Sequence, residues 1–123
     1  MSTTLESRDV AGGLDELIYL ATPYSHHDPD VQQQRFVAAC QVAGDLMNRG
    51  RLVFSPIAQS HPVACECGLP GTWEFWERYD RAILRACDRL VVVKMPGWEQ
   101  SRGIAAEIRI MRELGKPVEF MEF

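Results

Sequence analysis

The 123-residue sequence predicts a single-domain α/β protein with a short, open parallel sheet. Three observations predict this fold class. Short apolar runs alternate with longer segments of helical spacing, the pattern of βαβ units. The strongest run, residues 90–93, is Leu-Val-Val-Val, and a continuous β-branched run is typical of a strand covered on both faces. The length suits one domain. We therefore expect a three-layer α/β/α fold, Rossmann-like or flavodoxin-like, with about four strands.

The first predicted strand is the apolar run at residues 17–21. Asp28 and Pro29 then predict a helix start, because Asp caps free N–H groups and Pro suits the first helical position. Apolar side chains recur at three- and four-residue spacing through residues 36–47, which indicates one buried helix face. Gly50 ends this helix, since glycine adopts the left-handed conformation of a C-terminal cap.

A second strand is predicted at residues 52–55, stopped by Pro56. Residues 57–71 show no clear period, so we expect a long loop there, and long ordered loops are often functional. Thr72 is the predicted cap of the next helix, and Glu74 suits its first turn. The expected buried stripe of that helix consists of Phe75, Trp76, Tyr79, Ile83 and Cys87.

After the strand at residues 90–93, a loop leads to Ser101, which is a good helix cap. Apolar residues at helical spacing follow, and Gly115 closes this helix. Residues 117–120 are the last predicted strand. The order of elements predicts right-handed crossovers and helices on both sides of the sheet. We take residues 15–123 as the domain and residues 1–14 as a flexible tail.

Composition narrows the range of functions. The net charge of −4 argues against binding to a nucleic-acid polymer, which usually requires a basic face, but it allows a free nucleotide. No apolar run approaches the roughly 18–20 residues of a membrane span. The polar N-terminal stretch lacks the apolar core of an export signal. Four cysteines are too few for a disulfide scaffold. We therefore expect a cytoplasmic protein without membrane contact.

In open parallel sheets, ligands bind beyond the carboxyl ends of the strands. The segments that follow the strands are residues 22–27, residues 56–61 and the region from Trp98 to Gly103, and all are rich in polar and aromatic groups. Ser101 and Gly103 lie at a predicted helix start, whose free N–H groups attract an anion. Glu107 follows about 9 Å along the axis at 1.5 Å per residue, with its side chain leaning back. Together with the Ser101 hydroxyl it can flank a pentose, or it can be a solvated glutamate beside an ordinary cap.

Three motifs carry a family resemblance. The strand Tyr19-Leu-Ala-Thr-Pro-Tyr-Ser25 resembles the "YLAGPYS"-like opening of nucleoside 2-deoxyribosyltransferases. Ser101-x-Gly103-x-x-x-Glu107 resembles their nucleophile motif, and Tyr79-Asp80 resembles the stretch that holds a second active-site aspartate. The ordered set spans about residues 17–120. It also resembles a branch of this superfamily described only as a domain of unknown function (DUF1937-like).

The resemblance implies a double displacement at an N-glycosidic bond. Glu107 would attack C1′ and form a glycosyl-enzyme ester. Asp80 would protonate or orient the departing base, Tyr19 would position the nucleophile, and Gln59 would read a base edge with its amide. No cofactor or metal is implied, and the expected assembly is a homodimer or homotetramer. The remaining predicted contacts to the nucleoside or nucleotide come from Thr22, Tyr24, Ser25, Trp98, Ser101 and Gly103.

Two departures from the family pattern affect specificity. The position six before the nucleophile is an aspartate in the classical transferases but Ser101 here, as in deoxynucleoside 5′-monophosphate N-glycosidases. A serine at a helix start favours binding of a 5′-phosphate, which an aspartate would repel. This departure therefore favours a nucleotide substrate, or hydrolysis rather than transfer. The chain also ends at Phe123, without a counterpart of the family's C-terminal region. In the family, that region completes the neighbouring subunit's site.

Other interpretations of the sequence remain. A non-catalytic nucleotide-binding or sensing module would use the same sheet. A phosphoribohydrolase of the lysine-decarboxylase-like family is disfavoured, because its double-glycine motif is absent. His61, Cys65 and Cys67 lack an obvious fourth ligand, and structural zinc normally takes four, so we expect no metal there. His26 and His27 are expected in a polar loop that can reach the pocket mouth.

Overall fold

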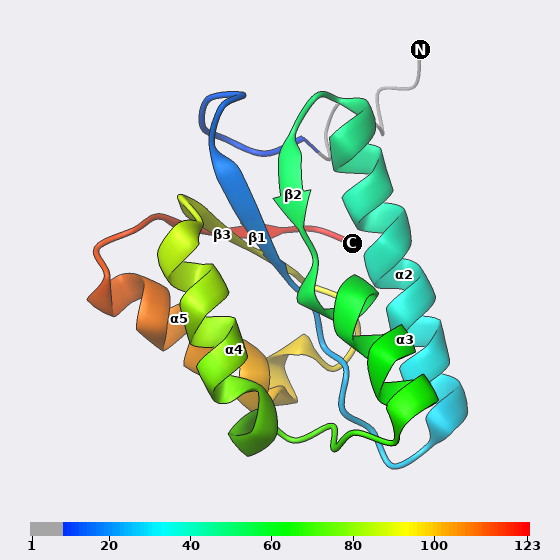
Figure 1. Cartoon of the computed structure of the whole chain (residues 1–123). Helices are drawn as coiled ribbons and strands as arrows, with labels where there is room; N and C mark the ends of the chain where they lie inside the picture. The colour runs from blue at the N-terminus through cyan, green and yellow to red at the C-terminus, as the bar shows by residue number, and fades with distance from the viewer. Residues whose placement is uncertain (1–8) are drawn as a thin grey trace.

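The computed structural model describes residues 9–123 (Figure 1). A four-stranded sheet has the order β2-β1-β3-β4, and every pair of neighbouring strands is parallel. Tyr19 lies in the middle of the sheet, opposite Phe54 on one side and Leu90 on the other. The strands are β1 (Leu17–Ala21), β2 (Leu52–Phe54), β3 (Arg89–Val93) and β4 (Val118–Met121).

Helices cover both faces of this sheet, which confirms the predicted α/β/α fold. In Figure 1, α2 and α3 lie together on one side and α4 and α5 on the other. Asp28 caps α2 by accepting the Asp30 N–H at 2.9 Å, and Pro29 occupies the first helical position, as the sequence predicts. The helices are α2 (Pro29–Asn48), α3 (Pro56–Cys67), α4 (Trp73–Ala86) and α5 (Arg102–Glu113), with a 3-10 turn η1 (Trp98–Gln100) before α5.

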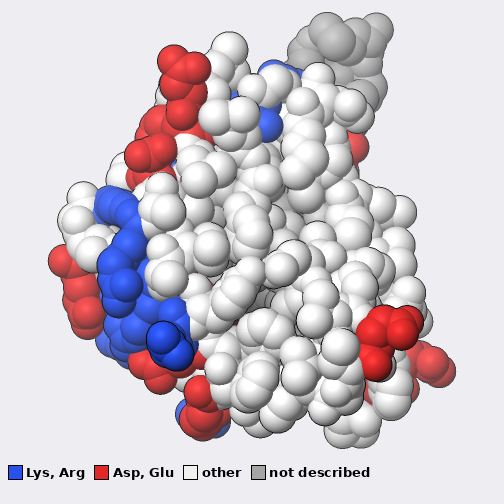
Figure 2. Space-filling view, in the orientation of Figure 1, with Lys and Arg blue, Asp and Glu red and all other residues white. Residues whose placement is uncertain are grey.

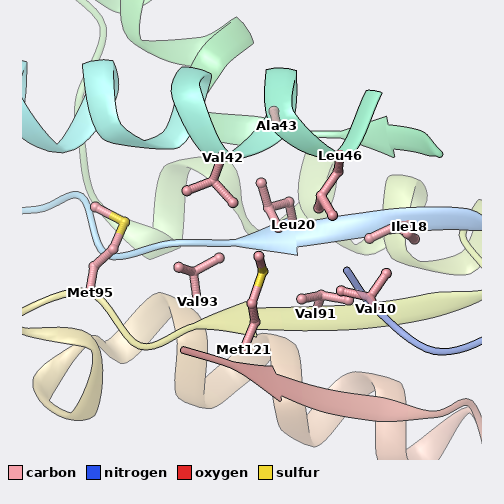
Figure 3. Close-up of a cluster of buried hydrophobic side chains, with 10 residues drawn as sticks. All are labelled: Val10, Ile18, Leu20, Val42, Ala43, Leu46, Val91, Val93, Met95 and Met121. Atoms are coloured by element: carbon pink, nitrogen blue, oxygen red, sulfur yellow. The ribbon is translucent and has the colours of Figure 1, made fainter. Parts of the chain in front are cut away.

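Alternate residues of the strands fill two separate cores. On one face, Val42, Ala43 and Leu46 of α2 point down onto β1 and β3 (Figure 3). On the other face, β1 contributes Tyr19 and Ala21, which pack with residues of α4 and α5. Because both faces are covered, β3 is buried along almost its whole length, as its β-branched sequence predicts.

The prediction of a loop at residues 57–71 is wrong, because most of this segment forms helix α3. Ser55 caps this helix by accepting the Ala58 N–H at 3.3 Å, Pro56 is its first residue, and Gly68 ends it with φ +65°. Pro62 lies inside the helix, and a proline there argues against a helix when only the sequence is read. The helix forms nevertheless, because the proline removes only one of its internal hydrogen bonds. The Ser-Pro start and the glycine end were the signals available in the sequence.

The prediction of which side chains of α4 are buried is also partly wrong. Phe75 and Tyr79 are 46% and 40% exposed, whereas Asp80 and Leu84 are buried. The helix is rotated so that a carboxylate faces the sheet. An apolar pattern cannot predict this, since hydrophobicity places a charged residue outside. The rotation brings Asp80 beside β1.

Residues 9–14, expected as part of a tail, pack against the domain. Val10 belongs to the core beneath α2. Arg51 binds the Asp9 carboxylate at 3.1 Å and the Gly12 carbonyl at 2.9 Å, which fixes the segment. The rest of the predicted tail, residues 1–8, lies outside the described residues. Within the part that the structure describes, the helices are too short or too polar to cross a membrane.

Candidate active site

A pocket of about 940 Å³ opens at the carboxyl ends of the strands, where the topology predicts a ligand site. Its wall is built from the segment after β1, the start of α3, the segment before α4, and the start of α5. Seven of the predicted site residues line it: Thr22, Tyr24, Ser25, Asp80, Ser101, Gly103 and Glu107.

Glu107 and Tyr19 meet beside this pocket. Glu107 lies on the face of α5 that packs on the sheet, and it is only 6% exposed. Tyr19 of β1 is fully buried, and its hydroxyl donates to Glu107 Oε2 at 2.5 Å. A hydrogen bond donated to a carboxylate holds it in one rotamer and stabilises its ionised form. Sequence and structure therefore agree in placing Tyr19 next to the candidate nucleophile.

Asp80 reaches the same place from α4. It is 9% exposed, lines the pocket, and interacts electrostatically with both Tyr19 and Glu107. It is therefore no ordinary carboxylate of a helix surface. The two carboxyl groups lie beside the same buried phenol, and we call Glu107 and Asp80 the carboxyl pair.

Burial shifts the protonation of this pair. Desolvation raises the pKa of Glu107 to about 8; the Tyr19 hydrogen bond opposes the shift and the Asp80 charge adds to it. Desolvation likewise raises the pKa of Asp80 to about 7, and the nearby Tyr19 hydroxyl opposes this shift. The two groups also repel each other when both are charged, so each is harder to ionise once the other has lost its proton. Around neutral pH a form with one shared proton is well populated.

The start of α5 forms another part of the pocket wall. Ser101 Oγ accepts the Ile104 N–H at 3.1 Å and caps the helix, as predicted. The Ser101 O–H remains free to donate to a ligand, because the cap uses only the oxygen lone pair. Gly103 lines the pocket on the first turn. Free N–H groups and the positive end of the helix dipole make this wall attractive to an anion.

Arg35 is a pocket residue that sequence analysis missed. It lies in the middle of α2, where the sequence offers no signal that distinguishes it from other helix-surface cations. Its guanidinium donates to the Ser25 carbonyl at 2.9 Å and the Pro96 carbonyl at 3.5 Å, and among the described residues it pairs with no carboxylate. Gly97 has φ +94°, and a Cβ there would lie 2.3 Å from Arg35 Nη2. Glycine therefore permits the close approach that ties two strand-end segments together.

The segment after β1 supplies polar groups to the pocket. The Thr22 hydroxyl is buried and has no hydrogen-bond partner within residues 9–123. Ser25 Oγ donates to the Gly71 carbonyl at 2.9 Å. The Tyr24 hydroxyl lies 2.5 Å from Nδ1 of the buried His61. His26 and His27, for which the sequence favoured an ordinary polar loop, also line the pocket.

Two predicted site residues lie elsewhere. Gln59 is exposed on α3, and its amide oxygen accepts the Tyr79 hydroxyl at 2.8 Å. Trp98 packs on the core beneath α5 and against Phe120, with ring centroids 5.6 Å apart. Neither belongs to the pocket wall. The helix α3, unforeseen in the sequence, turns Gln59 outward.

The acidic and histidine side chains do not gather into a metal centre. Within residues 9–123, no group of three or more His, Cys, Asp or Glu side chains is placed to hold an ion. Cys65 Sγ contacts His61 Nε2 at 3.6 Å, but Cys65 and Cys67 are both exposed free thiols. His61 instead bridges Tyr24 and Gln33.

The fold and the pocket define an α/β protein with a buried carboxyl pair at the ligand-binding edge of a parallel sheet. The family described as "Domain of unknown function (DUF1937)" matches residues 16–123, so the chain belongs to this family. No curated protein matches the chain.

The raised pKa of Glu107 predicts that this residue lowers the stability of the fold as pH rises. Between about pH 4.5 and pH 8 the folded state keeps a proton that the unfolded state has released, so the free energy of unfolding falls through this window. Glu107→Gln removes the titration and should raise Tm at pH 8 by a few degrees, with little change at pH 4. Thermal unfolding at both pH values measures the effect.

Glu113→Gln, an exposed glutamate at the end of the same helix, is the matched control and should leave Tm unchanged at both pH values. A Glu107→Gln variant that unfolds with wild type at pH 8 would show that Glu107 is not buried in a charge-disfavouring environment.

Proposed function

We propose that this protein cleaves or transfers at the N-glycosidic bond of a nucleoside or nucleoside 5′-monophosphate, through a covalent glycosyl ester on Glu107. The carboxyl pair carries the proposal: a tyrosine-held glutamate and a second carboxyl group lie together beside a pocket large enough for a nucleotide. Carboxylates are the usual nucleophiles for an anomeric carbon. The motifs shared with nucleoside 2-deoxyribosyltransferases support placing the family near that superfamily.

The first step uses the pair in its singly protonated form. The Glu107 carboxylate attacks C1′ as the C1′–N bond breaks, and the bonding electrons leave with the base. Asp80 donates its proton to that base, because an unprotonated base is a poor leaving group. The second step reverses the roles: Asp80 removes a proton from water or from a second base, which attacks C1′ and releases Glu107. Water gives hydrolysis and a base gives transfer.

The raised pKa values keep one proton on the pair near neutral pH, and they place it more often on Glu107, at about 8, than on Asp80, at about 7. The reactive form is the one in which this proton lies on Asp80. A carboxyl group at its ordinary pKa would have lost its proton at neutral pH and could not act as an acid. The Tyr19 hydroxyl favours ionisation of Glu107, because it donates to that carboxyl oxygen. Positive charge that develops on the sugar ring favours the same ionised form.

The pocket wall at the start of α5 supports the proposal that the substrate has a 5′-phosphate. The α5 start offers N–H groups and the Ser101 hydroxyl, and Arg35 adds a cation without a carboxylate partner in the described chain. A phosphate there would satisfy all three. A monophosphate is therefore the substrate form that we favour. We place the reaction in the cytoplasm, which suits four free thiols.

The first prediction of this proposal tests whether Glu107 is the nucleophile. Wild-type protein is incubated with the deoxynucleosides, the ribonucleosides and their 5′-monophosphates, and free base is followed by chromatography. We expect base release from at least one of them, and a loss of about a thousandfold or more in Glu107→Gln and Glu107→Ala. Glu113→Gln should keep the wild-type rate.

An unchanged rate in the Glu107 variants would refute Glu107 as nucleophile. Binding of a nucleotide by wild type without release or exchange of any base would favour a non-catalytic sensing module instead.

The second prediction concerns pH. The rate should follow a bell with its maximum between about pH 7 and pH 8, because the competent pair has one proton. At lower pH both groups are protonated and no nucleophile remains; at higher pH both are ionised and no acid remains. Asp80→Asn should remove the alkaline limb, measured as kcat/KM from pH 5 to pH 10. A rate independent of pH across this range would exclude the pair as acid and nucleophile.

The third prediction concerns assembly, for which we propose a homodimer or homotetramer. The face formed by α3, β2 and α4 has few charged side chains at its centre (Figure 2). These elements expose large apolar side chains, among them Leu52 at 50%, Val63 at 42% and Phe75 at 46%. Light scattering should give a multiple of 13.9 kDa, and Phe75→Glu should shift it towards the monomer. A monomeric wild type at high micromolar concentration would refute this assembly.

A further inference from the structure

A buried histidine that the proposed chemistry does not use lies behind the pocket wall. His61 of α3 is 7% exposed, and its ring packs on Phe36 with centroids 4.5 Å apart. Nδ1 lies 2.5 Å from the Tyr24 hydroxyl, and Nε2 lies 2.9 Å from Gln33 Oε1. The imidazole therefore connects a glutamine of α2 with a tyrosine that lines the pocket.

The amide of Gln33 determines the direction of these hydrogen bonds. A neutral imidazole has one N–H and one lone pair on its two nitrogens. An amide oxygen only accepts, so Nε2 must hold the hydrogen when Gln33 Oε1 faces it. Nδ1 then has the lone pair and accepts the Tyr24 O–H. The hydrogen bonds run from Tyr24 to His61 to Gln33.

We propose that this chain makes the Tyr24 hydroxyl a hydrogen-bond acceptor in the pocket. A phenol has a single hydrogen, and Tyr24 has given it to His61, so only lone pairs remain for a ligand. Tyr24 thus selects a substrate group that donates, either a sugar hydroxyl or an N–H of the base. His61 and Gln33 are positioning residues for it. The substrate's identity as a nucleoside or nucleotide rests on the proposed function; the direction of the chain does not.

The surroundings of Tyr24 and His61 favour this arrangement. Burial raises the pKa of the Tyr24 hydroxyl, so the phenol keeps the hydrogen that it donates. Cys65 lies one turn beyond His61 on α3, with Sγ 3.6 Å from Nε2 and 3.8 Å from Nδ1. These contacts are longer than the two oxygen contacts, and a thiol is a weaker partner. Cys65 therefore does not set the tautomer.

The tautomer of His61 tests the direction directly. Long-range proton–nitrogen NMR spectra of the chain of residues 1–123 distinguish its three histidines, and the signals lost in His61→Phe identify His61. We expect a hydrogen on Nε2 and none on Nδ1, in wild type and in Cys65→Ala alike. A hydrogen on Nδ1 would overturn the proposal, since Tyr24 would then be free to donate to ligands. This measurement needs no activity.

A double-variant cycle tests the consequence for the substrate. Tyr24→Phe and His61→Phe should each lower kcat/KM about five- to tenfold, mostly through a higher KM, and the double variant should lose no more than either single. His61→Asn, which can place an amide oxygen near the position of Nδ1, should recover part of the loss. Cys65→Ala should match wild type.

Losses that add in the double variant would show independent roles and overturn the positioning role of His61. If wild type releases base from none of the nucleosides or monophosphates, the proposed function fails. The same cycle is then measured on the dissociation constant of whichever of these probes binds most tightly, and the tautomer still decides the direction of the chain.

Discussion

The arrangement of the site depends on the burial of two carboxyl groups around one phenol hydroxyl. Tyr19 lies in the middle of the sheet with no exposure, and Glu107 and Asp80 reach it from different helices. Placing charge there costs free energy, because the interior has few dipoles that can replace water. The apolar cores on both faces of the sheet must offset that cost. Buried ionisable groups that lower the stability of the fold are typical of functional sites, because their burial does not itself stabilise the structure.

The topology explains why polar groups converge at one edge. Parallel strands end at the same edge, so the segments after β1 and β3 and the start of α5 become neighbours there. Arg35 fixes two of these segments through their carbonyls, and Gly97 allows it to pass. The cation therefore holds these segments together, and in the proposed function it would also attract the phosphate. A rigid sheet with tied segments is a suitable support for a preorganised pocket.

The sequence predicted most of the fold because its signals were local. Periodicity, the Asp28-Pro29 start and the β-branched strand are properties of short segments. The helix α3 was missed because Pro62 obscured a Ser-Pro start, and the buried side of α4 was misassigned because it contains Asp80. Glu107 and Ser101 could be selected from an ordered motif. Arg35 and the His61 chain could not, because their roles come from contacts between α2, α3 and the strand-end segments.

The distribution of charge within the pocket favours one orientation of a bound nucleotide. The carboxyl pair lies buried against the sheet, whereas Arg35 and the α5 start contribute positive potential to the rest of the wall. A phosphate is attracted by the cation and the helix start and repelled by ionised carboxylates, so the two effects favour one orientation. In the proposed function, that orientation would direct the sugar towards Glu107 and Asp80. If Tyr24 only accepts hydrogen bonds, as we propose, it would also discriminate among substrates of the same charge by whether they present a donor to it.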